Sequence, residues 1–398
     1  MTADRSPAAG HDVAIVGAGA VGLLLAVLLA QRGLDVTVLE RREAPSGRSR
    51  AIGIHPPGLS ALDAAGIGEA VRAEASLIRY GVVLHEGKGL GGIDFADAPI
   101  RTLPQHRTET LLESRLAELA PTALRRGVEV LAVRDRGDRV ELTLLDHEEP
   151  VARSVDGGAP PSTFGVPRTR TARLAVGADG VRSMVRGEID ATWIPYRGTG
   201  DYVMADEPAS AQPPETAILH LEREGVVESF PLPGGARRWV ARIPKARAVD
   251  AEAFSRLIDR RLSLHLDPER LSPPSTFTAR QHFAAPLARG RIALVGDAAH
   301  EVSPIGGQGM NLGWLDAIAL DAAIADALET GRSGPALERY ARARAIAAKR
   351  AMRRAAFNMA MGAPLAGARL KARNAFASSL ASPAMRGTLT AAFTMRGL

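Results

Sequence analysis

The stretch Asp12-Val-Ala-Ile-Val16-Gly17-Ala-Gly19-Ala-Val-Gly22 decides the fold of this chain. Its first five residues form a short, mostly apolar run that predicts a buried strand. Gly17 permits a tight turn after this strand, and Gly19 leaves room for a ligand to approach the backbone. Gly22 lets the following helix, expected over residues 23–31, pack close against a sheet. The stretch therefore predicts a strand, a glycine turn and a helix.

A second strand and an acidic residue complete this unit. The strand is expected over residues 35–39, and Glu40 follows it, 18 residues after Gly22. A carboxylate at the carboxyl end of this strand can accept hydrogen bonds from ribose hydroxyls, and the free N–H groups at the start of the helix favour a pyrophosphate. The pattern indicates a dinucleotide-binding Rossmann unit, but it does not by itself separate FAD from NAD.

Two later glycine-rich segments favour FAD. Asp179-Gly180 follows a strand expected over residues 172–176, and Gly296-Asp297 follows another over 292–295. A carboxylate at the end of such a strand can bridge the ribityl hydroxyls of FAD. The run Gly306-Gly307-Gln308-Gly309 then leads into a helix whose positive end suits the electron-rich edge of a reduced flavin.

Together, and in this order, the three segments resemble the class A flavoprotein aromatic monooxygenases, the p-hydroxybenzoate hydroxylase group, over roughly residues 11–330. The resemblance implies that Asp179 lies near the pyrophosphate and is linked to binding of FAD and NAD(P)H. It implies that Arg50 contacts the phosphates, and that Gln105 faces the flavin or the ribityl chain. The predicted cofactor-binding residues are Gly17, Gly19, Ala20, Val21, Gly22, Glu40, Arg41, Arg50, Gln105, Asp179, Gly296, Asp297, Pro304, Gly307, Gly309, Met310 and Asn311.

The fold class that follows is α/β, with a Rossmann-type FAD-binding domain, similar to that of glutathione reductase, interleaved with a smaller mixed or antiparallel sheet domain. The FAD-binding domain is expected over 1–75, 103–190 and 286–335, and the substrate domain over 76–102 and 191–285. Strand-like runs at 80–85, 217–221, 226–230 and 239–243 support the second sheet. Residues 156–170, rich in Gly, Pro, Ser and Thr, are expected to form an exposed loop. Residues 336–398 form a helical segment in this interpretation, and the resemblance is to the compact members, which have no thioredoxin-like domain.

The resemblance implies an NAD(P)H-dependent hydroxylase that acts on an aromatic or polyketide-like substrate with O2, through a C4a-hydroperoxyflavin. The chain has no cysteine, so its redox chemistry must come from a cofactor or a metal, and no metal site is predicted. Candidate catalytic residues are His55, His220, His300 and Pro304, with His85 as a further candidate base. The choice between NADH and NADPH stays open, as does that between monomer and homodimer.

Charge is distributed unevenly along the chain. From Gly331 to the end there are 13 Lys and Arg residues against one acid, Glu338. On a helix over residues 337–359 the basic side chains lie opposite an apolar face, which predicts packing on the FAD domain with a solvated basic side. Contact with a membrane surface is the alternative, and nucleic-acid binding is not expected. Because the N-terminus lacks the apolar core of a signal peptide, we expect a cytoplasmic protein.

Two other functions fit the same motifs. A flavin-dependent reductase of isoprenoid double bonds shares the three-segment architecture and needs no O2. A non-catalytic protein could keep FAD as a structural element. A flavin halogenase is disfavoured, because only Trp193-Ile194-Pro195 remains of its W-x-W-x-I-P segment and Ala191 stands in place of the first tryptophan.

Overall fold

The N-terminal stretch forms the centre of a parallel sheet. In the computed structural model, which describes residues 10–45, 47, 51–95, 97–146, 166–380 and 394–395, it folds as β1 (His11–Val16), α1 (Ala20–Gln31) and β2 (Val36–Glu40). β1 lies between β2 and β11 (Arg168–Gly177) and is parallel to both. The predicted strand, helix and second strand are therefore confirmed.

This sheet has eight strands, and its main path runs β19-β20-β11-β1-β2-β8. β10 is antiparallel to β11 and to β9, so a hairpin extends the sheet off this path. The further strands are β8 (Leu124–Arg126), β9 (Val128–Asp135), β10 (Val140–Asp146), β19 (Ala288–Arg289) and β20 (Ile292–Leu294). Because β11 and β20 are parallel to β1, the segments that follow all three strands reach the same edge of the sheet.

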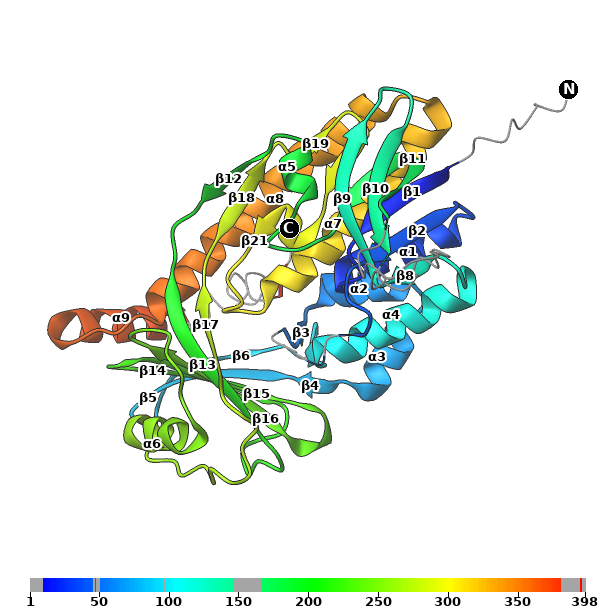
Figure 1. Cartoon of the computed structure of the whole chain (residues 1–398). Helices are drawn as coiled ribbons and strands as arrows, with labels where there is room; N and C mark the ends of the chain where they lie inside the picture. Colours follow the sequence, from blue (N-terminus) through cyan, green and yellow to red (C-terminus); the bar gives the residue numbers. More distant parts are fainter. Residues whose placement is uncertain are drawn as a thin grey trace, which may run out of the picture.

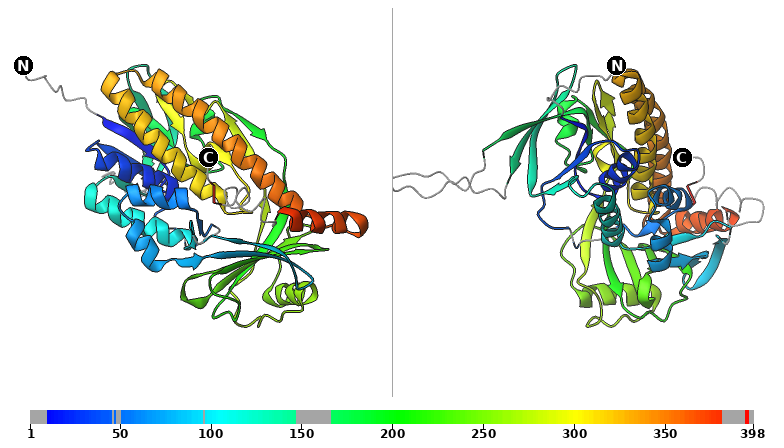
Figure 2. Two further views of the ribbon diagram at one scale, coloured as in Figure 1. Left: turned by 180° about the vertical axis from the view of Figure 1, so that it is seen from behind. Right: turned by 90° about the vertical axis from the view of Figure 1, so that its right-hand side faces the viewer.

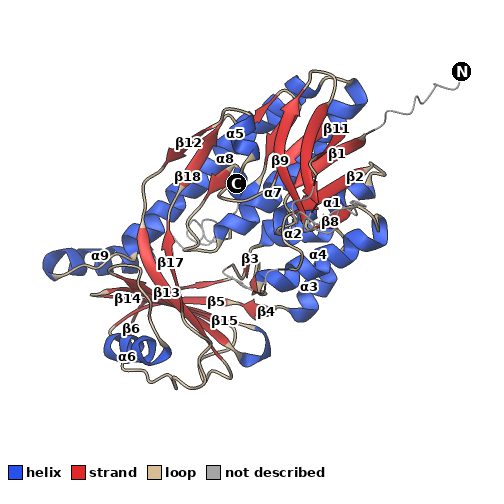
Figure 3. Ribbon diagram, in the orientation of Figure 1, coloured by secondary structure: helices blue, strands red, loops and turns tan. Residues whose placement is uncertain are grey.

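From Val13 to Val16 both faces of β1 are buried, which explains the unbroken apolar run of these four residues. Val13 and Ile15 pack in one core cluster with α1, whereas Ala14 and Val16 pack in a second cluster on the other face. The first cluster also contains residues of α4 (Gln105–Leu119) and α7 (Gln308–Thr330). Figure 3 shows these helices in blue beside the red strands. The start of α1 is thus fixed between a sheet and two helices.

A second, seven-stranded sheet lies at the other end of the molecule (Figure 1). Its order is β17-β13-β16-β15-β14-β5-β6, and the strand runs expected at 80–85, 217–221, 226–230 and 239–243 are confirmed within it. α6 (Ala251–Leu262) covers its outer face. The strands are β5 (Tyr80–His85), β6 (Lys88–Asp94), β13 (Gly200–Glu207), β14 (Thr216–Glu222), β15 (Gly225–Pro231), β16 (Arg237–Ile243) and β17 (Ser275–Ala279).

Two long helices run beside each other along the first sheet. α7 and α8 (Ser333–Met361) lie side by side in both views of Figure 2, and α9 (Gly367–Leu380) continues from them. The apolar residues of α8 that include Leu337, Ala348 and Met352 are buried, whereas Arg339 and Arg350 are exposed. The predicted packing of the basic helix is confirmed, with its charges mostly on the solvent side; Arg344 is buried.

The remaining elements are short. They form two three-stranded sheets, β3-β7-β4 and β12-β18-β21, and three short helices. The bounds are β3 (Gly53–Ile54), β4 (Ser76–Ile78), β7 (Ile100–Thr102), β12 (Thr192–Pro195), β18 (His282–Ala285), β21 (His300–Glu301), α2 (Pro56–Ala64), α3 (Gly68–Glu74) and α5 (Val185–Glu188). In the described part of the chain, no helix combines the length and the apolar character needed to cross a bilayer.

One boundary differs from the sequence expectation. Residues 156–165 lie outside the described residues, but Arg168 to Arg170, expected in the same loop, form the start of β11. Their backbone pairs with Leu142 to Leu144 of β10. The loop prediction was wrong for these three residues. Their backbone pairs with β10 at an exposed end of the sheet, where arginine side chains can extend into solvent although the local composition favours a loop.

Candidate FAD and substrate site

The three glycine-rich segments meet at the start of α1. A Cβ atom on Gly22 would lie 2.1 Å from the Gly17 carbonyl oxygen and 3.1 Å from the Ala178 side chain, which immediately precedes Asp179. Gly17 has a φ of +106°, which other residues rarely adopt. A Cβ atom on Gly296, whose φ is +58°, would lie 3.1 Å from Val21. The close contacts therefore hold all three segments around the first turn of one helix.

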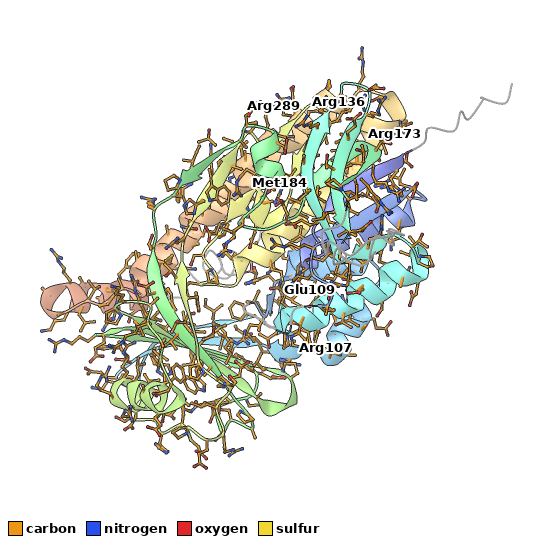
Figure 4. The ribbon with its side chains drawn as sticks, in the orientation of Figure 1. Arg107, Glu109, Arg136, Arg173, Met184 and Arg289 are labelled. Carbon is orange, nitrogen blue, oxygen red and sulfur yellow. The ribbon has the colours of Figure 1, made fainter. Side chains whose placement is uncertain are left out.

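The first turn of α1 already binds an anionic oxygen. The Ala20 amide donates a hydrogen bond to Glu109 Oε1 at 3.2 Å, and Gln105 Nε2 donates to the same oxygen at 2.9 Å. Glu109 projects from α4 (Figure 4). A Cβ atom on Gly19 would meet only Glu109 Oε1, at 4.0 Å, so the backbone here is open to a close ligand. This arrangement fits a phosphate, which uses the same N–H groups and dipole.

Glu40 is buried at the carboxyl end of β2. Its Oε2 accepts a hydrogen bond from the Ala18 amide at 2.9 Å, and its Oε1 accepts one from Arg42 Nε at 2.8 Å. Burial alone would raise the pKa of Glu40, but the bonds from Arg42 and Ala18 outweigh it and lower that pKa. Arg41, the arginine named from the sequence, is exposed, and Arg50 lies outside the described residues.

Asp179 lies at the end of β11 with one oxygen engaged and one available. Its Oδ2 accepts hydrogen bonds from the amides of Met184 and Val185, at 2.7 and 3.2 Å. Its Oδ1 is buried and has no hydrogen-bond partner among the described residues. A buried, unsatisfied carboxylate oxygen is costly, so a ligand hydroxyl or ordered water is the expected partner.

Gly296 is held by a buried network of charged groups. Asp316, fully buried on α7, accepts hydrogen bonds from the Gly296 amide at 3.2 Å, His300 Nε2 at 2.5 Å and Arg344 Nε at 2.6 Å. Burial would raise the pKa of Asp316, but His300 and Arg344 lower it. Arg344 belongs to the basic helix α8, so one arginine of that helix acts inside the molecule.

Asp297, next in sequence, has a different environment. Its side chain is accessible to solvent, yet protein atoms surround it closely enough that desolvation raises the pKa of its carboxyl. A carboxylate that is both accessible and enclosed is suited to hydrogen bonds with ligand hydroxyls. Gly296 therefore packs against α1, and the neighbouring Asp297 carboxylate is accessible to solvent.

The glycine loop before α7 is fixed by Asn311. Its Nδ2 donates to the carbonyl oxygens of Gly53 and Gly307, both at 2.9 Å, and its Oδ1 accepts a bond from the His55 amide at 2.9 Å. Gly307 caps α7 with a φ of +65°. Gly309 and Met310 lie in the first turn of this helix, and Pro304 is exposed in the loop. The loop and the start of α7 thus stand against β3.

The candidate histidines lie in different places. His55 borders the loop, because a Cβ atom on Gly307 would lie 3.3 Å from its Nε2. His300 is bound to Asp316, and His85 Nδ1 lies 2.9 Å from the Leu221 carbonyl oxygen. His220 stands opposite Val227, whose side chain packs on the α6 face of the second sheet. Burial, followed by the nearby Arg237, lowers the pKa of His220 to about 4. Of the four, only His55 lies at the glycine loop.

The inner face of the seven-stranded sheet carries a buried carboxylate that the sequence reading did not single out. Val226 and Val240 of this face share a core cluster with Ile305 of the glycine loop and Met359 of α8. Glu228 lies on the same face, since it stands directly opposite Val240. Burial raises the pKa of Glu228 to about 7.

Replacing Glu228 by glutamine is expected to stabilise the protein at alkaline pH. The pKa of Glu228 is higher in the folded protein than in the unfolded chain, so ionisation of Glu228 destabilises the folded state. The free energy of unfolding therefore falls as the pH rises toward about 7. Relative to the wild type, the free energy of unfolding of Glu228→Gln should be higher by about 3 kcal/mol at pH 8.5 and by about half of that at pH 5.5. Urea unfolding at the two pH values measures this gain, and a gain that does not grow with pH would contradict the assignment.

Comparison with known proteins agrees with this geometry. A family model described as FAD binding domain matches residues 10–355. An aromatic compound monooxygenase of Bacillus subtilis (strain 168), itself uncharacterized, is 32% identical over 341 residues, covering 83% of this chain and 64% of that protein. A 6-methylpretetramide 4-monooxygenase of Streptomyces rimosus is 32% identical over 352 residues, covering 83% of this chain and 58% of that protein.

A solved structure shares the fold. The p-nitrophenol 4-monooxygenase of Pseudomonas putida DLL-E4 superposes with a TM-score of 0.82 at 24% identity, covering 98% of this chain and 99% of that one. The chain spans about three fifths of the length of the two curated relatives named above. Since the family model matches most of the chain, and the glycine segments converge as that fold requires, the chain belongs to the FAD binding domain family.

Proposed function

We propose that this chain is an FAD-dependent monooxygenase that hydroxylates an aromatic or polyketide-like substrate. The overall reaction consumes NAD(P)H, one proton, O2 and the aromatic C–H compound, and it yields NAD(P)+, water and the phenol. The observation that carries this proposal is the convergence of Gly19, Asp179 and Gly296-Asp297 on the start of α1, in a chain of the FAD binding domain family. Relatives named as monooxygenases of aromatic or polyketide compounds support the reaction class.

The proposed roles follow the order of the groups along FAD. The amides at the start of α1 would bind the pyrophosphate, and Glu40 the adenosine ribose, with Asp179 beside them. Asp297 would bind the ribityl chain, and the loop from Pro304 to Asn311 would border the ring. When bound, FAD supplies the activation of O2, and the protein excludes water and orients the substrate.

We also propose the interleaved division of the chain into an FAD domain at 1–75, 103–190 and 286–335 and a substrate domain at 76–102 and 191–285. Membership of the two large sheets supports it: β5, β6 and β13 to β17 form the second sheet, and the parallel strands belong to the first. The substrate would then lie between the inner face of the second sheet and the glycine loop before α7.

Oxygen dependence tests this function. The purified FAD-loaded chain is expected to oxidise NADH or NADPH with O2 uptake, and a bound phenol should both accelerate the oxidation and gain one hydroxyl group. Reduced nicotinamide, dissolved O2 and product are measured together. Anaerobic turnover of a polyene would instead indicate a double-bond reductase, and FAD binding with no turnover of any kind would indicate a non-catalytic protein.

A further inference from the structure

The strand β15 places one carboxylate among aliphatic side chains on the face that turns toward the glycine loop. Glu228 stands between Leu219 of β14 and Val240 of β16, its direct cross-strand neighbours. Along its own strand the residues on the same face are Val226 and Phe230. Glu228 is 5% exposed. No hydrogen bond or ion pair to its carboxylate is formed by any residue that the structure describes.

Other charged groups facing the same side are already engaged. Arg238 of β16 binds Asp206 of β13 through two hydrogen bonds of 2.7 and 2.8 Å. Arg242 of β16 donates to the Met359 carbonyl oxygen at 2.7 Å. Neither cation pairs with Glu228, so among the described residues Glu228 is the acid on this face without a partner, whereas Asp206 is paired.

Tyr202 of β13 is a further titratable group on this face. It is fully buried, its hydroxyl has no hydrogen-bond partner among the described residues, and its ring stacks on Phe277. Burial, followed by the charge of Glu228, raises the pKa of Tyr202 to about 12. The hydroxyl of Tyr202 therefore stays neutral at working pH, whereas Glu228 changes its charge near neutral pH.

A second buried acid of the same sheet, Glu222, shows that burial does not by itself leave a carboxylate without partners. Glu222 of β14 is equally buried, but its Oε1 accepts a hydrogen bond from the Glu86 amide at 3.0 Å and its Oε2 lies 3.3 Å from His85 Nδ1. A carboxylate buried for structural reasons is normally paired in this way. Glu228 lacks such partners, and its face shares a core cluster with Ile305, which lies three residues before Gln308 at the start of α7.

We propose that Glu228 is the specificity-determining residue of the substrate site: it accepts a hydrogen bond from a phenolic hydroxyl and rejects substrates that carry a carboxylate. This inference rests on the proposed function, which places the substrate against this face. The O–H group of a neutral polyphenolic or polyketide-like ring system can donate a hydrogen bond to the unpaired carboxylate. The apolar surface of the ring system can pack against Leu219, Val240 and Phe230. An anionic substrate would instead meet a like charge in an apolar environment.

Three bicyclic probes of similar shape test this assignment by equilibrium dialysis against the FAD-loaded protein. The probes are 2-naphthol, 2-methoxynaphthalene without the donor, and 6-hydroxy-2-naphthoate with an added carboxylate. The wild type should bind 2-naphthol on the order of 10-fold more tightly than either of the others, as expected for a hydrogen bond to a charged group. Its affinity for 2-naphthol should also rise from pH 6 to pH 8, as Glu228 ionises.

The matched variants are Glu228→Gln and Glu222→Gln, two buried acids on opposite faces of one sheet. Glu228→Gln should lose the preference for 2-naphthol, which is on the order of 10-fold in the wild type, and its affinity for 2-naphthol should no longer change with pH. It should also bind 6-hydroxy-2-naphthoate more tightly than the wild type does. Glu222→Gln should keep the wild-type order of affinities. Unchanged discrimination in Glu228→Gln, the same loss in Glu222→Gln, or no binding of any probe to the wild type would each overturn the assignment.

These outcomes are separable from those of the proposed function, because dialysis needs no turnover. If the probes are hydroxylated but Glu228→Gln discriminates as the wild type does, the inference fails and the monooxygenase proposal stands. If Glu228→Gln loses 2-naphthol binding but no probe is hydroxylated under O2 with NAD(P)H, the binding role stands and the monooxygenase proposal fails.

Discussion

Alanine at position 19 is expected to weaken FAD binding by about 100-fold while leaving the FAD-free protein as stable as the wild type. The φ and ψ angles of Gly19, −81° and 177°, suit any residue, and its new Cβ would meet no atom closer than 4.0 Å. The methyl group would instead occupy the open space at the first turn of α1. Loss of two charge-assisted hydrogen bonds from this turn to the pyrophosphate corresponds to about 3 kcal/mol, or on the order of 100-fold.

Gly22→Ala provides the contrast. Its Cβ would lie 2.1 Å from the Gly17 carbonyl oxygen, so the substitution should destabilise the protein even without FAD. Quenching of FAD fluorescence during titration of the apoprotein gives the affinity, and urea unfolding of the same apoprotein gives the stability. If Gly19→Ala binds FAD as the wild type does, the pyrophosphate does not lie at the start of α1.

Replacing Asp316 by alanine is expected to lower the free energy of unfolding by about 3–5 kcal/mol. The substitution would leave Arg344 and His300 buried without their shared acceptor and would free the Gly296 amide. Because Gly296 packs against Val21 of α1, FAD affinity should fall together with stability. Chemical unfolding and FAD titration of the same variant measure the two effects.

Asp326→Ala serves as the matched control. Asp326 lies on the same helix, α7, and also pairs with an arginine of α8, Arg339, but both side chains are exposed. An exposed pair contributes at most about 1 kcal/mol, so this variant should keep nearly all of its stability and its FAD. Equal losses in Asp316→Ala and Asp326→Ala would show that burial does not set the strength of these ion pairs.

The backbone features of the site were accessible from the sequence because they are local. Gly17, Gly22 and Gly296 each sit where a positive φ or a close backbone contact requires glycine, and such constraints can be read from spacing along the chain. The strand runs and the amphipathic helix α8 were accessible for the same reason, since their periodicity is local.

Side-chain partners were less accessible because they come from distant elements. The contact of Glu40 with Arg42 rather than Arg41 depends on which way each side chain turns after β2. The inward turn of Arg344 depends on Asp316, 28 residues earlier. Glu228 was visible as an acid in the otherwise mostly apolar run 226–230, but only the strand register shows which face it occupies.

The most direct test of the monooxygenase assignment is the origin of the oxygen atom in the product. The FAD-loaded chain is incubated with NAD(P)H and a bound phenol under 18O2 in ordinary water, and the product is analysed by mass spectrometry. One 18O atom per new hydroxyl group is expected, with one NAD(P)H consumed for each product formed. A hydroxyl group that carries oxygen from water, or a product formed equally well without O2, would contradict the monooxygenase assignment.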